Sequence, residues 1–248
     1  MKVSVVIPAR YASTRFPGKL LAPLGDKPVL WHTWQAAQKM KLVDEFIVAV
    51  DDERLHQAVE SWGGTARMTG SEHSSGLERI ASLVHELKGD IILNVQGDEP
   101  FIDPSLLDTI IERAKVSAAP ILTAVCPIRL EEDVRNPNIV KVILSQESKA
   151  LYFSRSPIPY VRDFPASEWL QQASFYGHIG VYCYKRAVLE NYAKLPQSRL
   201  EEAEKLEQLK FLDYGYTLEA IKTDSRPQGV DTPEDLQKLQ AQLSCRNA

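Results

Sequence analysis

Three cations lie close together near the start of the chain, at Arg10, Arg15 and Lys19. Positive charges at this spacing repel one another unless an anion lies among them. Arg offers planar pairs of donors to phosphate oxygens and Lys a mobile point charge, so residues 8–19 predict a polyphosphate site. A solvated basic loop is the alternative, but the turn-forming pair Pro17-Gly18 and the loop's position after a strand favour the site.

Two acidic segments could supply a metal site beside that anion. Asp98 lies in Asn94-Val95-Gln96-Gly97-Asp98-Glu99-Pro100, and Asp231 lies in residues 229–236. Mg²⁺ usually takes one or two carboxylates together with phosphate oxygens, which predicts Asp98 and Asp231 as its ligands. The simpler interpretations are a turn carboxylate at Asp98 and a helix cap at Asp231 or Thr232. We assign the cap to Thr232 and the metal to Asp231.

A third segment, residues 73–79, opens an expected helix with polar groups. Ser75 and Gly76 present backbone N–H groups and a hydroxyl that suit a base or a carbonyl, and Arg79 follows one turn later on the same face. Ser75 and Glu78 also fit a capping box. The two interpretations are compatible, because a capped helix start can also be a binding edge.

Polar side chains in the second half are more ambiguous. Arg155 is a candidate partner for a substrate carboxylate. His178 lies among small and apolar neighbours, where a hydrogen-bonded core histidine is the default. Glu207 and Gln208, taken alone, fit the solvated face of a helix.

Alternating strand and helix patterns must position these residues in the first half of the chain. Apolar runs predict strands over residues 3–7, 45–50, 65–68 and 90–95. Helices are expected over residues 28–39, from a cap at Asp51 or Asp52 to about Trp62, and over 76–87 and 104–115. This rhythm predicts a parallel sheet with helices on both faces. The Arg10 loop and Asp98 then share the carboxyl edge of the sheet, where open α/β sheets bind ligands.

The pattern changes after Ala118. Strands are expected over residues 121–126, 139–144, 150–153, 177–184 and 216–221, an extended segment over 154–163, and helices over 185–193, 201–212 and 232–243. We interpret residues 1–248 as a single domain with an embedded antiparallel insertion at residues 119–184. We expect the insertion to contribute to a substrate site and to an oligomer contact.

Composition excludes several classes of protein. The chain has 248 residues, a formal net charge of -4 and 44% hydrophobic residues, which argues against a broad nucleic-acid surface. No apolar run is long enough to cross a bilayer, and the first residues lack the charged and apolar regions of a signal peptide. Cys126, Cys183 and Cys245 have no metal spacing, so we expect reduced thiols in a cytoplasmic protein.

The ordered set of motifs is similar to one family. Pro-Ala-Arg-x-x-Ser-x-Arg-x-Pro-Gly-Lys from Pro8 is followed by Asn-Val-Gln-Gly-Asp-Glu-Pro, Ser-Arg-x-x-Ile-Pro, Gly-His-Ile-Gly-Val-Tyr, Leu-Glu-Gln-Leu and Gly-Val-Asp-Thr-Pro-Glu-Asp-Leu. Together they closely resemble the 3-deoxy-manno-octulosonate cytidylyltransferases, or CMP-Kdo synthetases, from Val3 to Leu236. The first motif alone fits several nucleotidyltransferases, whereas the whole set is much more specific.

The resemblance implies a Rossmann-like, GT-A-like nucleotidyltransferase fold with a mixed, mainly parallel sheet, a homodimer, and a place in lipopolysaccharide biosynthesis. CTP would be held by Pro8, Ala9, Arg10, Arg15, Lys19, Ser75, Arg79 and Gln96. The eight-carbon sugar acid would be surrounded by Gln96, Arg155, His178, Tyr182, Glu207 and Gln208. Asp98 and Asp231 match the Mg²⁺ ligands, and Arg10 and Lys19 would act with them in catalysis.

The expected reaction is attack of the sugar acid's anomeric hydroxyl on the α-phosphorus of CTP, with release of pyrophosphate. One Mg²⁺ would neutralise the triphosphate, and a second, on Asp98 and Asp231, would activate the hydroxyl. Rival interpretations are a cytidylyltransferase for sialic acid or an alcohol phosphate, a metal-dependent glycosyltransferase, and a CTP sensor without catalysis. The glycosyltransferase would need an Asp-x-Asp element that Asp98-Glu99-Pro100 does not provide.

One segment departs from the family pattern. The family reads His-Gln-Ser-Gly-Thr-Glu-Arg where this chain has His73-Ser74-Ser75-Gly76-Leu77-Glu78-Arg79. Ser74 and Leu77 either are neutral at a helix start or reshape the pocket. Relatives that accept the 8-amino analogue of Kdo exist, so the acceptor stays open between the two.

Overall fold

The computed structural model describes residues 1–13 and 15–246. Its strands are β1 (Val3–Ala9), β2 (Pro23–Leu24), β3 (Lys27–Pro28), β4 (Glu45–Val50), β5 (Ala66–Met68), β6 (Ile91–Asn94), β7 (Ile121–Pro127), β8 (Lys141–Leu144), β9 (Ala150–Ser154), β10 (Tyr176–Lys185) and β11 (Leu218–Lys222). Its α-helices are α1 (Val29–Ala37), α2 (Glu53–Ser61), α3 (Gly76–Ser82), α4 (Pro104–Val116), α5 (Glu131–Arg135), α6 (Trp169–Gln172), α7 (Arg186–Tyr192), α8 (Arg199–Glu204), α9 (Gln208–Asp213) and α10 (Pro233–Arg246). Short 3₁₀ turns lie at η1 (Lys19–Leu21) and η2 (Ala166–Glu168).

The central sheet is mixed and mainly parallel, which confirms the predicted fold class. Its strand order is β11-β7-β10-β6-β1-β4-β5, and β10 is antiparallel to both of its neighbours on this path, β6 and β7. The pairs β1–β4, β1–β6, β4–β5 and β7–β11 are parallel. The chain moves from β1 outward through β4 and β5, then returns to place β6 on the other side of β1. This reversal opens a crevice at the carboxyl ends of β1 and β6, where such sheets bind ligands.

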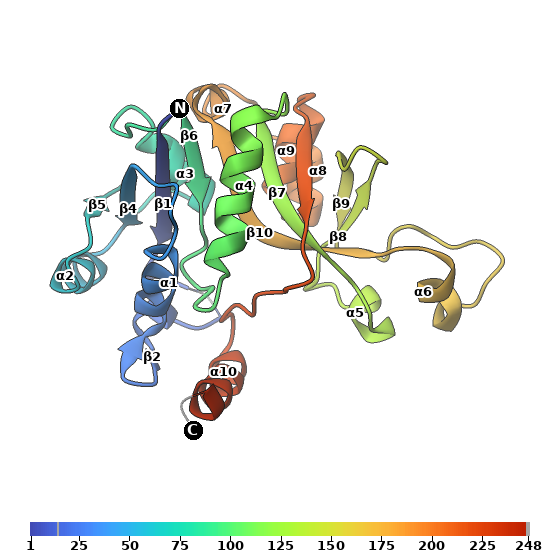
Figure 1. The fold of residues 1–248 in the computed structure, drawn as a ribbon, viewed down its shortest axis with the longest axis horizontal. Helices are drawn as coiled ribbons and strands as arrows, with labels where there is room; N and C mark the ends of the chain where they lie inside the picture. The colour runs from blue at the N-terminus through green and yellow to red at the C-terminus, as the bar shows by residue number, and fades with distance from the viewer. Residues whose placement is uncertain (14, 247–248) are drawn as a thin grey trace.

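Helices cover both faces of the sheet (Figure 1). All seven residues of β1 are buried, as expected of a central parallel strand. Alternate side chains of β1 point to opposite faces: Val5 packs in a cluster with Leu30 of α1 and Leu107 of α4, whereas Val6 packs in a cluster with Ile80 of α3. Helices α7 and α9 complete the second cluster. Both loops that follow β1 and β6 therefore start from a rigid base.

Most predicted elements are confirmed within a few residues. Asp52, one of the two predicted caps, accepts the Arg54 amide at the start of α2, which leaves Asp51 available for other contacts. Thr232 is the predicted cap of α10: its hydroxyl accepts the Asp235 amide, and the Asp235 carboxylate accepts the Thr232 amide. The helix predicted over 76–87 ends at Ser82, because the chain tightens there into i→i+3 hydrogen bonds.

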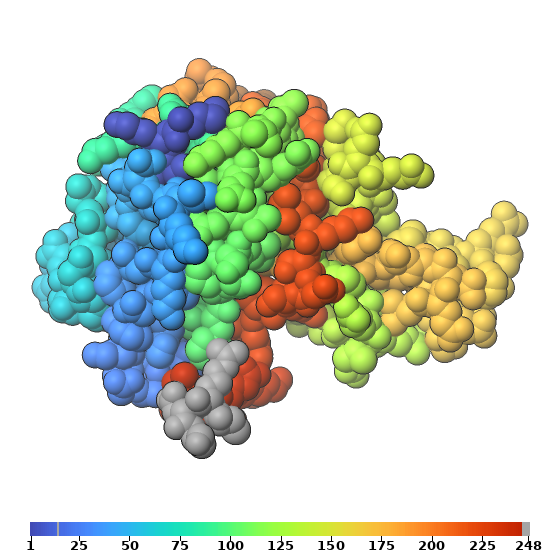
Figure 2. Space-filling model, in the orientation of Figure 1, coloured from blue at the N-terminus to red at the C-terminus, as the bar shows by residue number. Residues whose placement is uncertain are grey.

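Part of the predicted insertion at residues 119–184 projects from the body as a lobe (Figures 1 and 2). We define the lobe as residues 128–175, which carry α5, β8, β9 and α6. It has a small core of its own, formed by Ile128, Val134, Ile139 and Phe175. The strands at the two ends of the insertion, β7 and β10, are members of the central sheet. The lobe is thus anchored directly to the strands beside the crevice.

The C-terminal helix α10 packs back against the first part of the chain. Leu239 joins Leu24, Val29 and Val230 in a cluster beside the β2–β3 hairpin, an element that the sequence did not predict. This packing carries the segment before α10, with Asp231, to the loop that follows β1. Within the described residues, no helix is both long and apolar enough to cross a membrane.

Candidate functional site

Two cavities open at the carboxyl edge of the central sheet, and they share Asp98 and Asp231. The first, which we call the β1 cavity, has a volume of about 260 Å³ and is lined by Pro8, Ala9, Arg10, Ser13, Arg15, Lys19, Leu20, Ser74, Ser75, Gly76, Arg79, Gln96, Gly97, Asp98, Glu207 and Asp231. The second, the β10 cavity, has a volume of about 500 Å³ and is lined by Asp98, Glu99, Asn138, His178, Ile179, Gly180, Arg226, Pro227, Gln228, Gly229 and Asp231.

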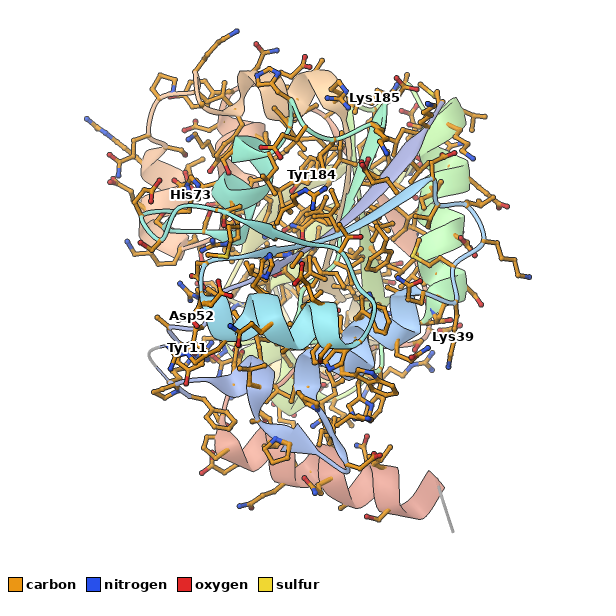
Figure 3. All side chains as sticks on the ribbon, turned by 90° about the vertical axis from the view of Figure 1, so that its left-hand side faces the viewer. Tyr11, Lys39, Asp52, His73, Tyr184 and Lys185 are labelled. Carbon is orange, nitrogen blue, oxygen red and sulfur yellow. The ribbon has the colours of Figure 1, made fainter. Side chains whose placement is uncertain are left out.

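The loop after β1 folds its predicted cations into the β1 cavity. The Gly18 amide bonds to the Tyr11 carbonyl, and Gly18 has a φ of 69°, a left-handed conformation that glycine adopts without strain. This turn begins η1 and directs Lys19 inward, whereas Arg10 stays exposed at the rim. Figure 3 shows Tyr11 and Asp52 near each other on the side of the molecule that also carries His73, opposite Lys39.

The Lys19 ammonium joins the two predicted metal ligands. Its Nζ lies 2.5 Å from Asp98 Oδ2 and 3.2 Å from Asp231 Oδ1, and Arg15 Nη2 lies 2.8 Å from the same Asp231 oxygen. The Val230 amide also donates to the Asp98 carbonyl at 2.9 Å, which fixes the two segments to each other. Residues separated by more than 130 positions in sequence therefore meet between the two cavities.

This arrangement fits a divalent cation. Two carboxylates that converge on one ammonium nitrogen can also converge on a metal ion, and carboxylate oxygens are the ligands that Mg²⁺ prefers. In the part of the chain that the structure describes, no group of three or more His, Cys, Asp or Glu side chains is placed to hold a metal. An ion between Asp98 and Asp231 would therefore complete its coordination with oxygens of a substrate or of water.

Ser75 and Arg79 line the β1 cavity, but Arg79 is also a structural anchor. The Ser75 hydroxyl accepts the Glu78 amide as the cap of α3, as predicted. The Arg79 side chain is only 2% exposed; it donates to Asp51 at 3.0 Å and also to Thr69 and the Gly70 carbonyl. Asp51 in turn accepts the Tyr11 amide. Arg79 thus holds together the loops that follow β1, β4 and β5.

The two departures from the family pattern have different environments. Leu77 is 1% exposed and packs in the core cluster beneath α3, away from both cavities. Ser74 lines the β1 cavity, where its amide and hydroxyl both donate to Glu78. Only the Ser74 departure reaches the wall of a cavity.

Glu207 does not lie on the solvated helix face that its local sequence alone favoured; it lines a cavity, as a site residue would. The single helix predicted over 201–212 is two helices, α8 and α9, because Lys205 adopts a left-handed conformation with φ 54°. The break buries Leu206 and turns Glu207 into the β1 cavity rather than to solvent. Burial, and secondarily the charge of Glu201, raise the pKa of Glu207 to about 7, although hydrogen bonds from the Leu77 amide and the Ser75 hydroxyl oppose this.

His178 combines both of the roles considered for it. Its Nε2 lies 2.8 Å from Thr123 Oγ1, and its ring packs against Phe153 and Tyr182. Burial lowers the pKa of His178 to about 3, so the ring is neutral at pH 7. Its position next to a bulge in β10 nevertheless allows it to line the β10 cavity.

Three other predicted sugar-acid residues do not line either cavity. The Arg155 guanidinium donates to the backbone carbonyls of Glu204, Pro137 and Lys205. Tyr182 is buried in a stack with Tyr184, and Gln208 is 5% exposed. Gln96, predicted to lie near both substrates, lines the β1 cavity and reaches toward Gly180 of the β10 cavity.

The structure adds cavity residues that sequence reasoning passed over, mainly Ser13, Glu99, Asn138, Arg226 and Gln228. Glu99 directly follows Asp98, but only Asp98 was predicted from this motif as a site residue. Burial and the charge of Asp98 raise the pKa of Glu99 to about 8. Nothing in the local sequence around Asn138 or Arg226 signals a cavity, because distant segments create it.

Comparison with known proteins gives consistent results. Residues 4–222 match the cytidylyltransferase family. A 3-deoxy-manno-octulosonate cytidylyltransferase from Geobacter sulfurreducens is 43% identical, over 98% of this chain and 100% of the relative. The protein of the same name from Escherichia coli is 39% identical, over 98% of this chain and 96% of the relative.

Solved structures agree with these sequence matches. A CMP:2-keto-3-deoxy-manno-octonic acid synthetase complexed with CTP superposes with a TM-score of 0.93 at 39% identity, and the match covers 99% of this chain and 100% of the other. A cytidylyltransferase from Leptospira borgpetersenii, at 17% identity and a TM-score of 0.66, shares the fold over 99% of this chain and 87% of its own.

Proposed function

The chain belongs to the 3-deoxy-manno-octulosonate cytidylyltransferases, and on that premise we propose that it transfers the cytidylyl group of CTP to Kdo. The observation that carries this proposal is the meeting of Asp98, Asp231 and Lys19 between two cavities. A nucleotidyl transfer needs such a place, because one substrate must be attacked by the other while negative charge is neutralised.

CTP would occupy the β1 cavity. Arg10, Arg15 and Lys19 supply positive charge for its triphosphate, and Arg side chains suit phosphate oxygens because they form paired hydrogen bonds. The cytidine would then lie toward Ser75 and Gln96, with Pro8 and Ala9 forming the backbone wall and Arg79 holding the surrounding loops. Glu207 lines the same cavity, so we place it at the nucleotide as well as near the acceptor.

The sugar acid would occupy the β10 cavity, which is larger and lined by polar groups. His178, neutral because it is buried, can exchange a hydrogen bond with a hydroxyl without introducing charge. Gln96 and Gly180 lie where the two cavities approach each other. Tyr182 and Gln208 do not line this cavity, so they would act indirectly, by packing that holds β10 and α9 in position.

We further propose that the reaction depends on Mg²⁺ held by Asp98 and Asp231, whose convergence supports this choice. When bound, the ion would supply charge neutralisation and Lewis acidity at the reacting oxygens. Lys19 would then be released toward the phosphates. The protein's own part is to hold both substrates in line and to balance the charge of the leaving group.

The bond changes follow from this placement. The anomeric oxygen of the sugar acid forms a bond to the α-phosphorus, and the bond from that phosphorus to the bridging oxygen of the β-phosphate breaks. Pyrophosphate leaves with the electron pair, stabilised by Arg10 and Lys19, and the hydroxyl proton passes to water. The product is a CMP-sugar, which we assign to lipopolysaccharide biosynthesis.

We also propose a cytoplasmic homodimer. The lobe exposes Tyr160 (77%), Leu151 (58%) and Leu130 (54%), apolar surface that a second copy could cover. Cys126 and Cys183 are buried and free, in keeping with a reducing compartment; the Cys245 side chain lies outside the described part of the chain. Light scattering on the purified protein measures the oligomeric state, and a monomer would contradict the dimer.

The decisive experiment measures pyrophosphate release with CTP, Mg²⁺ and Kdo, and identifies the product by mass spectrometry. We expect CMP-Kdo, and no turnover when Mg²⁺ is replaced by a chelator. Parallel reactions contain the 8-amino analogue or sialic acid in place of Kdo. Binding of CTP without release of pyrophosphate under any of these conditions would favour a nucleotide sensor and overturn the proposal.

A further inference from the structure

Arg226 lines the β10 cavity, in the segment between β11 and α10. Its Nη1 lies 3.4 Å from Oδ2 of Asp133, a residue of α5 in the lobe. The side chain is 42% exposed, so a molecule in the cavity can reach it.

The charges around this cavity make Arg226 distinctive. Three carboxyl groups line it, from Asp98, Glu99 and Asp231. Within the described part of the chain, Arg226 is the one Lys or Arg on its wall, and His178 is neutral. A fixed positive charge therefore faces whatever occupies this cavity.

The position of Arg226 indicates which part of a ligand it would meet. Asp98 and Asp231 mark the end where the β10 cavity joins the β1 cavity, so the reacting group must lie there. Asn138 is a residue of the lobe and Arg226 is tied to the lobe through Asp133, so these two residues form the lobe side of the cavity wall. In a 2-keto sugar acid the carboxylate and the anomeric hydroxyl are on adjoining carbons, so both stay at the reacting end. The hydroxylated tail would extend toward Arg226.

We infer that Arg226 is a specificity-determining residue that donates hydrogen bonds to the tail hydroxyls of the acceptor and disfavours a cationic group there. This inference rests on the proposed function and extends it to the choice of acceptor. A hydroxyl oxygen accepts from a guanidinium, whereas an ammonium has no lone pair to offer and is repelled by the like charge. The enzyme would therefore prefer Kdo to its 8-amino analogue.

A competition experiment tests this inference. Wild-type protein and the variants Arg226→Gln and Arg226→Lys are given equal concentrations of Kdo and the 8-amino analogue with CTP and Mg²⁺. The ratio of the two CMP-sugars is measured by mass spectrometry. This ratio does not depend on how much of the enzyme is folded, so a merely structural role of Arg226 would leave it unchanged.

We expect Arg226→Gln to shift the product ratio toward the amino sugar by about tenfold, because the charge is lost and donors remain. Arg226→Lys keeps the charge and should keep the preference for Kdo. The KM for CTP should not change in either variant. The Michaelis constant for Kdo should rise in Arg226→Gln by a smaller factor than the ratio shifts.

Arg129→Ala is the matched control. Arg129 pairs with Asp224 at 2.9 Å, so it also ties the segment after β11 to the lobe, but it is 73% exposed and does not line the cavity. We expect its product ratio to equal that of the wild type. An unchanged ratio in Arg226→Gln, or an equal shift in Arg129→Ala, would overturn the inference. If the wild type releases no pyrophosphate with either acceptor, the proposed function itself fails.

Discussion

The β1 cavity and the β10 cavity are built in different ways. The β1 cavity is formed mainly by loops that directly follow β1 and β6, two buried parallel strands in the centre of the sheet. The β10 cavity is formed by a bulged antiparallel strand, the segment after β11 and the turn after α5. Both cavities join segments that are far apart in sequence, but most of the β1 cavity wall starts from central strands of the sheet, whereas the β10 cavity wall includes the lobe residue Asn138 and the segment after β11.

The two cavities also differ in charge. Four cationic side chains, those of Arg10, Arg15, Lys19 and Arg79, line the β1 cavity, whereas Arg226 is the one Lys or Arg on the described wall of the β10 cavity; three carboxyl groups line each cavity. We therefore assign different roles to the two cavities. The β1 cavity would serve a chemistry common to many nucleotidyltransferases, and the β10 cavity would determine which acceptor is used.

The largest expected effect is at the junction of the cavities. Asp98→Asn should lower kcat by roughly 10³-fold or more, because one of the two charged oxygen donors for the metal is lost. Pyrophosphate release at saturating Mg²⁺ measures it. Circular dichroism should show an intact fold, and Asp26→Asn, in the turn between β2 and β3, is the surface control. A near-normal rate for Asp98→Asn would show that Asp98 has no role in catalysis. It would also contradict the placement of the reacting groups where the two cavities meet.

A second variant tests how Arg155 stabilises the lobe and its contact with α8. Arg155→Ala should lower the free energy of unfolding by about 2 kcal/mol, because three backbone carbonyls lose a charged donor. Urea denaturation measures this, and Arg162→Ala, an exposed residue of the same lobe, should show no change. If Arg155→Ala is fully stable but has a tenfold higher KM for Kdo, Arg155 contacts the substrate instead.

A third test concerns the pH dependence that the buried carboxyl of the β1 cavity gives to stability. The pKa of Glu207 is about 7 in the folded protein, against an ordinary value of 4.5. Because the folded protein holds this proton more tightly, its free energy of unfolding falls as pH rises from about 4.5 to 7, by up to roughly 3 kcal/mol. Other groups titrate in the same range; His178, whose folded pKa is low, acts in the opposite direction.

Glu207→Gln isolates the contribution of this one group. The difference in unfolding free energy between the wild type and Glu207→Gln should decline with pH through that window and level off above it. Denaturation curves from pH 4.5 to 8 provide the measurement, with Glu202→Gln as an α8 surface control. A difference that stays constant with pH would mean that Glu207 ionises normally and faces solvent.

The parts of the fold that could be predicted from sequence are those with strong local patterns. The continuous apolar run of β1 and the charge cluster after it predicted one wall of the β1 cavity, Thr232 was recognisable as a cap, and the cap of α2 was narrowed to Asp51 or Asp52. The helix break at Lys205 was missed, because a left-handed lysine has no local signal and the burial of Leu206 and Gln208 favours it only in the folded protein.

The sequence by itself determined the family, the class of reaction and the cluster of cations that we assign to the triphosphate, because these lie in contiguous motifs whose side chains and backbone act together. Tertiary structure decided the rest. It brought Asp231 to Asp98 across the molecule, turned Glu207 inward, engaged Arg155 with backbone carbonyls and placed Arg226 on the wall of the β10 cavity. Those positions depend on packing between distant segments, and burial and charge at such contacts are properties of the assembled fold rather than of any stretch of chain.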